Sequence, residues 1–353
     1  MHPQPLPYLD PAFLESEEAR PLRILAEYLE PLRRFRAENI QDTVVFFGSA
    51  RIHSREHAEL ALDQMVRRYG ARTTGEVEEV IARGRKAVEW SRYYEEAREL
   101  AGLLTEWTKT LEGPHHRFVV TSGGGPGIME AANRGAHDAG GKTIGLNIKL
   151  PFEQGANRYI TDGLHFEFHY FFMRKFWFAY LAKALVVFPG GFGTLDEMFE
   201  ILTLMQTEKL AKQIQIILYG TDYWDPILSL EPLREWGAIS PDDMNLIQRA
   251  NTPDHAFALL KDHLTVHHLV PATVQETRAP GIAKTKSGSD RWSPPTTPVG
   301  PDLPGPGCNA DEYCALEEGD PCGAPDASAP CLARPEVCAQ IFAPVCACDG
   351  NTY

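Results

Sequence analysis

The sequence ALVVFPGGFGTLDE, residues 184–197, joins a short apolar run to a glycine-rich loop and then to the start of a helix-forming segment. A continuous apolar run of this length is typical of a strand that is buried on both faces. A loop that leaves such a strand and opens a helix points backbone N–H groups and the positive end of the helix dipole at one spot. The stretch therefore predicts a strand, a turn and a helix that can bind a phosphate or a carboxylate.

The same order of apolar run, loop and helix recurs along the chain. Residues 118–121 run into Gly123-Gly124-Gly125 and a helix over 127–139, and residues 43–47 end at Gly48-Ser49. Further strands are expected at 143–148, 165–168 and 214–218, and further helices at 170–183, after the loop to about 210, around 226–236 and at 254–264. This alternation predicts a Rossmann-like, doubly wound parallel sheet with helices on both faces. Such a sheet binds ligands at the carboxyl ends of its strands.

Composition divides the chain into four regions. These are a helical leader, a Rossmann-like domain, a proline-rich linker and a cysteine-rich tail, at residues 1–42, 43–268, 269–307 and 308–353. In the leader we expect one amphipathic helix over 11–38 or two helices broken at Pro21 and Pro31. The charged segment at about 54–96 reads as a helical insertion in the Rossmann-like domain.

The composition also excludes several classes of protein. The 353 residues include 34 lysines and arginines against 48 aspartates and glutamates, a net charge of -14, so we expect no nucleic-acid partner. All seven cysteines lie at or after Cys308, which leaves the body without a disulfide framework or a thiolate nucleophile. Neither a secretory signal nor a membrane span is recognised, so we expect a cytoplasmic protein without a membrane partner.

Glu197 has two interpretations. A threonine followed three residues later by a glutamate forms a capping box, so Thr194 and Glu197 can simply begin a helix. Alternatively, Glu197 stands beside a phosphate-binding turn, where the sugar attached to that phosphate would lie. The spacing alone favours the cap.

Arg174 lies on an apolar stripe of the helix expected over residues 170–183. A buried guanidinium needs an anionic partner. That partner is a ligand or an internal carboxylate such as Glu167, unless the side chain snorkels to solvent. We expect the neighbouring Lys175 to face solvent.

Cofactor motifs are absent from the sequence. A dinucleotide fingerprint that started at Gly123 would place Ile128 where the third glycine belongs. A phosphate-loop pattern over residues 136–143 ends a helix and enters a strand, the reverse of a nucleotide-cradling loop. His165 and His169 lack a third ligand nearby. We therefore expect neither a metal nor an organic cofactor.

Taken together, these segments resemble the LOG family, the "lonely guy" cytokinin-activating phosphoribohydrolases formerly labelled lysine decarboxylases. The family signature P-G-G-x-G-T-x-x-E is met in full at residues 189–197. Met173-Arg174-Lys175 resembles the family's Arg-Lys block, with a shortened spacing from the methionine. Residues 123–130 resemble its glycine block and residues 47–50 the end of its first strand. The resemblance covers about residues 43–265.

The resemblance implies hydrolysis of the N-glycosidic bond of a nucleoside 5'-monophosphate, AMP or an N6-modified AMP, to free base and ribose 5-phosphate. It implies that Glu197 and Arg174 are catalytic, that no cofactor is needed, and that the protein is a homodimer or higher homo-oligomer. The substrate-binding residues that it implies are Gly48, Ser49, Gly124, Gly125, Met173, Lys175, Gly190, Gly191, Gly193 and Thr194.

Two other functions stay open at this point. A nucleotide-binding regulatory protein can keep the fold and the phosphate site without turnover. A decarboxylase needs a lysine that forms a Schiff base with pyridoxal phosphate, and no lysine stands in a convincing setting for that role.

The tail has a resemblance of its own. Cys338-x7-Cys346-x-Cys348, followed by Asp-Gly-Asn-Thr-Tyr353, resembles the opening of a Kazal-type protease-inhibitor module. A reducing cytoplasm would not form its disulfides. We therefore expect a truncated or fused fragment of such a module and not a working inhibitor.

Overall fold

The computed structural model describes residues 5–69, 75–150, 155–210, 212–269, 312–314 and 331–333. The chain divides into two compact units, Met1–Lys284 and Thr285–Tyr353. In the second unit the described residues form an antiparallel pair of short strands, β8 (Glu312–Cys314) and β9 (Cys331–Ala333). The proline-rich linker beyond residue 269 and the Kazal-like segment lie outside the described residues.

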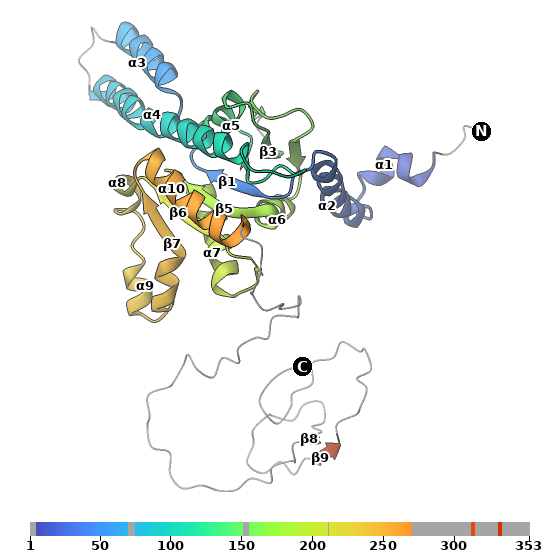
Figure 1. The fold of residues 1–353 in the computed structure, drawn as a ribbon. Coiled ribbons are helices and arrows are strands. Elements are labelled where there is room, and N and C mark those ends of the chain that lie inside the picture. Colours follow the sequence, from blue (N-terminus) through green and yellow to red (C-terminus); the bar gives the residue numbers. More distant parts are fainter. Residues whose placement is uncertain are drawn as a thin grey trace, which may run out of the picture. The chain divides into compact units, whose positions relative to one another are not determined.

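The first unit is built around a seven-stranded sheet in which neighbouring strands are parallel (Figure 1). In spatial order the strands are β4 (His165–Phe168), β3 (Thr143–Ile148), β2 (Val119–Ser122), β1 (Thr43–Phe47), β5 (Ala182–Val187), β6 (Gln215–Tyr219) and β7 (Ile247–Ala250). The chain starts at the centre, winds to the β4 edge, returns to pair β5 with β1, and winds to the other edge. This order confirms the Rossmann-like, doubly wound fold, and its switch point lies between β1 and β5.

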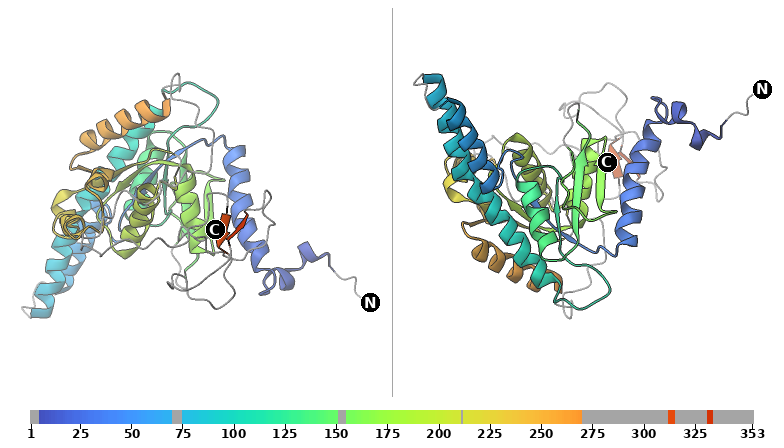
Figure 2. Two further views of the ribbon diagram at one scale, coloured as in Figure 1. Left: turned by 90° about the horizontal axis from the view of Figure 1, so that it is seen from below. Right: turned by 90° about the horizontal axis from the view of Figure 1, so that it is seen from above.

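Helices cover both faces of the sheet (Figure 2). The helices of the described residues are α1 (Pro11–Leu14), α2 (Arg20–Ala37), α3 (Arg55–Tyr69), α4 (Gly75–Thr108), α5 (Ile128–Asp138), α6 (Phe171–Leu181), α7 (Phe192–Gln206), α8 (Thr221–Trp224), α9 (Glu231–Glu235) and α10 (Pro253–Leu264), and those that pack on the sheet include α4, α5, α6, α7 and α10. Successive residues of a strand point to opposite faces. Val45 and Phe47 therefore pack with α6 and α7, whereas Val44 and Phe46 pack with α4, α5 and α10. Burial on both faces explains why β1 is apolar throughout.

The leader helix α2 runs unbroken through Pro31, so of the two alternatives left open for the leader, a break at that residue is wrong. A proline removes the N–H that would bond the carbonyl four residues earlier, here that of Glu27. The indole Nε1–H of Trp177 on α6 donates to the Glu27 carbonyl oxygen instead, at 2.9 Å. Pro21 lies in the first turn of α2, where a helix tolerates proline. The leader thus belongs to the same compact unit as the sheet.

Two further segments depart from a simple alternation of strands and helices. Helices α3 and α4 pack against each other and project beyond the sheet (Figure 1), and burial on α4 is concentrated from Ser91 to Thr105. Strand β7 was missed in the sequence because it is an edge strand with a polar sequence, in which Gln248 and Arg249 are exposed. No helix among the described residues has the length and apolar character needed to cross a membrane.

Candidate active site

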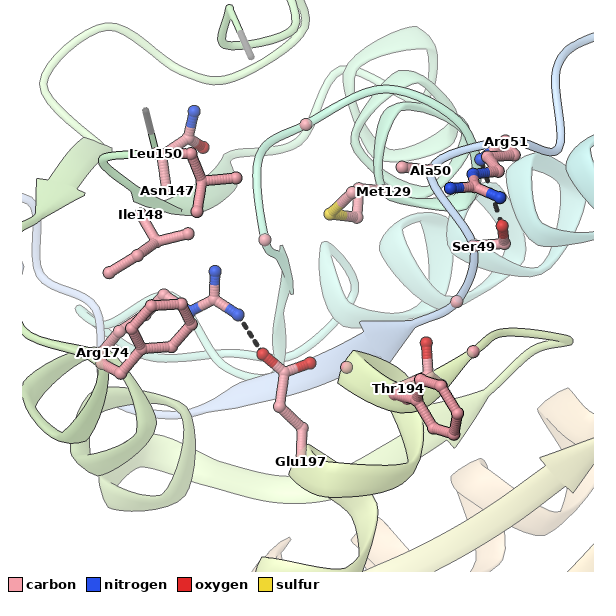
Figure 3. Close-up of a pocket in the computed structure, with 17 residues that line it drawn as sticks. Ser49, Ala50, Arg51, Met129, Asn147, Ile148, Leu150, Arg174, Thr194 and Glu197 are labelled. Atoms are coloured by element: carbon pink, nitrogen blue, oxygen red, sulfur yellow. Dashed lines mark hydrogen bonds and ion pairs between the residues drawn. The ribbon is translucent and has the colours of Figure 1, made fainter. Parts of the chain in front are cut away.

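A cavity of about 650 Å³ opens at the carboxyl ends of the central strands, where the strand order reverses (Figure 3). Its walls come from the loops after β1, β2, β3 and β5 and from helices α5, α6 and α7. Both residues expected to be catalytic, Arg174 and Glu197, line it. The expected substrate-binding residues on its wall are Gly48, Ser49, Gly125, Gly191, Gly193 and Thr194. The structure thus gathers the ends of three sequence motifs around one space.

Helix α7 begins at Phe192, and its N-cap is Gly191, which has no side chain to accept a hydrogen bond. Thr194 therefore lies inside the first turn and Glu197 in the second, so the capping-box interpretation is wrong. Gly190 permits the close packing of this turn, because a Cβ there would lie 2.2 Å from the Thr194 Oγ1. The first-turn N–H groups have no acceptor within the helix, and the residues that carry them line the cavity.

Glu197 extends from α7 and forms an ion pair with Arg174 of α6 (Figure 3). The Arg174 and Glu197 side chains are 14% and 11% exposed, so solvent screens the pair only weakly. Burial raises the pKa of the Glu197 carboxyl, and the nearby guanidinium opposes that rise. The carboxylate that pairs with Arg174 is therefore Glu197 and not Glu167.

Two aromatic rings confine the Arg174 guanidinium. Its Cζ lies 5.8 Å from the ring centroid of Phe171 and 5.3 Å from that of Phe178, which is within the range of cation–π attraction. Its Nε is buried and has no hydrogen-bond partner among the described residues. One terminal nitrogen bonds Glu197, and the other points away from it (Figure 3). A donor thus remains for a ligand.

Four of the expected substrate-binding residues do not line this cavity: Gly124, Gly190, Met173 and Lys175. Met173 is 7% exposed and belongs to the apolar core. Lys175 does not face open solvent as expected, because its Nζ pairs with Asp196 at 2.8 Å and with Glu200 at 3.1 Å. Lys175 thus joins α6 to α7 next to the catalytic candidates without lining the cavity.

The loop between β2 and α5 is locked by glycines. Gly124 has φ +74°, and a Cβ there would lie 1.8 Å from Oδ1 of Asn147. Gly127 has φ +73°, and its Cβ would lie 2.3 Å from the carbonyl oxygen of Ser49. The N–H of Ile128 donates to that same oxygen at 3.1 Å. The loop therefore fixes the backbone at the end of β1, where the cavity begins.

Several cavity residues were missed in the sequence. Arg51 lines the cavity from the loop after β1, and its only early signal is its place just beyond Gly48-Ser49. An apolar wall is supplied by Met129, Ile148, Leu150 and Phe192. These side chains come from three separate segments, so no local pattern brings them together.

The described residues around the cavity do not include the groups that would bind a metal ion or pyridoxal phosphate. Within the described ranges, no group of three or more histidines, cysteines, aspartates or glutamates is placed to hold a metal ion. Among those same residues, no lysine lines the cavity. Burial lowers the pKa of Lys212 to about 7, but its Nζ donates to the carbonyls of Ala179 and Tyr180 away from this cavity. The lysine-dependent decarboxylase interpretation therefore has no candidate residue in this cavity.

Comparison with known proteins gives consistent similarities. The family model described as "Possible lysine decarboxylase" matches residues 129–260. The cytokinin riboside 5'-monophosphate phosphoribohydrolase LOG of Oryza sativa subsp. japonica is 30% identical over 191 residues, which cover 52% of this chain and 70% of the rice protein. A probable enzyme of the same name from Arabidopsis thaliana is 29% identical over 156 residues, which cover 42% of this chain and 74% of that protein.

Among solved structures, the Moco carrier protein of Chlamydomonas reinhardtii covers 64% of this chain and 99% of its own, with 18% identity and a TM-score of 0.38. The rice protein is more similar to this chain in sequence, with 30% identity over an alignment that covers 70% of the rice protein. Residues 189–197, which carry the P-G-G-x-G-T-x-x-E signature, form the β5–α7 loop and the first turns of α7. On this similarity, the chain belongs to the LOG family.

Proposed function

We propose that the protein hydrolyses the N-glycosidic bond of a nucleoside 5'-monophosphate, AMP or an N6-modified AMP, to free base and ribose 5-phosphate. The observation that carries the proposal is the Arg174–Glu197 ion pair, which lies on the cavity wall beside the N-terminus of α7. A helix N-terminus suits a phosphate, and a carboxylate suits the sugar next to it. The names of the rice and Arabidopsis relatives support the same substrate class.

Glu197 supplies the chemistry in this proposal. Breaking the bond between the ribose C1' and the base builds positive charge on the sugar ring. A carboxylate at the anomeric face stabilises that charge and takes a proton from the attacking water. The water oxygen bonds to C1', and a proton leaves with the base, so the reaction balances with water alone. No redox group or metal is required.

Arg174 favours the ionised form of Glu197 and holds it in place. Burial disfavours a charged carboxyl, and the guanidinium offsets part of this effect because it attracts the charged form. The rings of Phe171 and Phe178 restrict the guanidinium. Its second terminal nitrogen can donate to a ribose hydroxyl. The first turn of α7 then holds the phosphate, which fixes the sugar over the carboxylate.

We also propose that the protein acts as a homodimer or higher homo-oligomer. Large apolar side chains are exposed on the layer formed by α2, α6 and α7: Leu25, Phe172, Tyr180 and Phe199. Phe172 lines one surface hollow with Leu25 and another with Tyr180, so these three form a contiguous apolar surface of the kind that marks an interaction site. Light scattering after size exclusion should give at least twice the chain mass of 39.4 kDa, and a monomer at micromolar concentration would contradict this proposal.

Incubation of the purified full chain with AMP tests the proposed reaction. We expect free adenine and ribose 5-phosphate in equal amounts, measured by chromatography and by a reducing-sugar assay. AMP that binds without being cleaved would support the nucleotide-binding regulatory alternative instead. A chain that neither binds nor cleaves AMP would overturn both.

A further inference from the structure

The charges on the cavity wall do not cancel. Among the described residues that line it, the charged side chains are Arg51, Arg174 and Glu197. Arg174 and Glu197 neutralise each other as an ion pair. One positive charge, that of Arg51, is left in a chain whose net charge is -14. The cavity wall therefore carries one unbalanced positive charge, although the protein as a whole is acidic.

Arg51 is held near the start of α7 by backbone contacts. Its own N–H donates to Oγ of Ser49 at 3.1 Å. The N–H of Ser49 donates to the carbonyl of Pro189 at 2.9 Å, which ties the loop after β1 to the loop after β5. The Arg51 side chain is exposed, and it has no ion-pair partner among the described residues. Its guanidinium is therefore available to a ligand.

The cavity has two ends with different chemistry. Figure 3 shows Arg51 and Ser49 on the side where Thr194 lies. On the opposite side lie the apolar Ile148 and Leu150, together with Asn147 and Arg174, and Glu197 lies between the two ends. A nucleoside monophosphate has the same order of parts, since its sugar lies between a charged phosphate and a flat, largely apolar base.

We propose that Arg51 binds the 5'-phosphate together with the first-turn N–H groups of α7, and that it thereby selects nucleotides over nucleosides. The proposal rests on the substrate class given under the proposed function. A phosphate monoester carries about -1.5 to -2 charges at neutral pH, whereas a helix N-terminus supplies only about half a positive charge. A guanidinium fork adds a full charge and paired donors that match phosphate oxygens.

Binding without turnover provides the test. In full-length protein with Glu197→Gln, calorimetry measures the Kd of AMP, adenosine and inorganic phosphate, with and without Arg51→Ala. Loss of a charge-assisted contact in Arg51→Ala should weaken AMP binding by about tenfold to hundredfold. The Kd of adenosine should stay unchanged. Arg51→Lys should recover part of the loss, because an ammonium keeps the charge but not the fork.

Arg55→Ala is the matched control. Arg55 is also an exposed arginine on the segment after β1, at the start of α3, and it does not line the cavity. Its removal changes the net charge equally, so a general electrostatic effect would appear in both variants. Circular dichroism and the melting temperature show whether each variant is folded, and Arg51→Gln replaces Arg51→Ala if the latter is not.

The outcomes separate this proposal from the proposed function. The role of Arg51 is overturned if an Arg51 variant binds AMP as tightly as its parent. It is also overturned if the substitution weakens the binding of AMP and of adenosine by the same factor. Failure of the parent to bind AMP or inorganic phosphate also overturns it. A wild-type chain that binds AMP through Arg51 but releases no ribose 5-phosphate overturns only the hydrolase.

Discussion

The two glycine loops of the sheet look alike in sequence and differ in what their glycines do. The β2–α5 loop contains Gly124 and Gly127, whose φ angles are +74° and +73° and whose added Cβ atoms would overlap neighbouring atoms. In the β5–α7 loop, Cβ atoms added at Gly191 and Gly193 would meet nothing within 4 Å. The first pair is needed for packing. The second pair leaves open backbone beside the cavity.

The helices that follow these loops differ in the same way. Glu130 in the first turn of α5 accepts a hydrogen bond from the Tyr94 hydroxyl at 2.7 Å, a contact between two helices. Glu197 on α7 lines the cavity and pairs with Arg174. One loop and helix therefore hold the structure of the site, and the other presents its chemistry. The difference is one of surroundings, which a glycine pattern does not encode.

The largest expected effect is on folding, from Gly127→Ala. The new Cβ would lie 2.3 Å from a backbone oxygen at Ser49, and a left-handed φ of +73° strains any residue with a Cβ. We expect a loss of about 3 kcal/mol or more in the free energy of unfolding. Urea denaturation measures it, with Gly193→Ala as control.

The control should keep its stability within about 1 kcal/mol, because alanine favours a helix and no atom is close to the new methyl group. Equal destabilisation by both substitutions would remove the distinction between the two loops.

The next effect is on ligand binding, from Gly193→Ala. A methyl group at the first turn of α7 would extend toward the cavity, where we propose that the phosphate binds. We expect AMP binding to weaken by about tenfold to hundredfold, with a normal melting temperature. Titration calorimetry with AMP checks this, and undiminished affinity would place the phosphate elsewhere.

The smallest expected effect is a shift along the pH axis. Burial raises the pKa of Glu197 above that of an ordinary glutamate, and Arg174 opposes the rise. Glu197 must be ionised to act, so kcat/KM should fall as the pH drops through this raised pKa. Arg174→Gln removes the lowering influence and should move the fall to higher pH, in addition to reducing the rate.

The pH profile of Glu130→Gln is the comparison for that experiment, because Glu130 opens the packing helix α5 and does not line the cavity. Its acidic limb should coincide with that of the wild type. An acidic limb that shifts in Glu130→Gln and not in Arg174→Gln would contradict the assignment of the titrating group to Glu197.

Much of the fold was predictable because a parallel sheet buries both faces of its central strands. The bounds of β1 and β3 agree with the strands predicted at Thr43–Phe47 and Thr143–Ile148. The edge strand β7 was not predicted, because Gln248 and Arg249 are exposed and the strand lacks an apolar run. The passage of α2 through Pro31 depends on the distant Trp177 donor, which local propensity does not contain.

The candidate site was predictable only where a motif marks it. The family signature pointed to Glu197, but the spacing did not show that α7 begins at Phe192 with Gly191 as its N-cap. The capping box at Thr194 was therefore favoured wrongly. Arg174 was seen to need an anion, yet its partner lies 23 residues away on another helix. Arg51 carries no signal beyond its position, because an exposed arginine after a strand is common.

One measurement addresses the central claim that Glu197 is catalytic: the release of ribose 5-phosphate from AMP by wild type, Glu197→Gln and Asp196→Asn. Asp196→Asn removes the same charge one residue away. Asp196 is 58% exposed, pairs with Lys175 and does not line the cavity. We predict that Glu197→Gln stays folded, still binds AMP and loses at least about 10²–10⁴ in rate, while Asp196→Asn remains active. A folded Glu197→Gln chain that cleaves AMP at the wild-type rate would contradict the account.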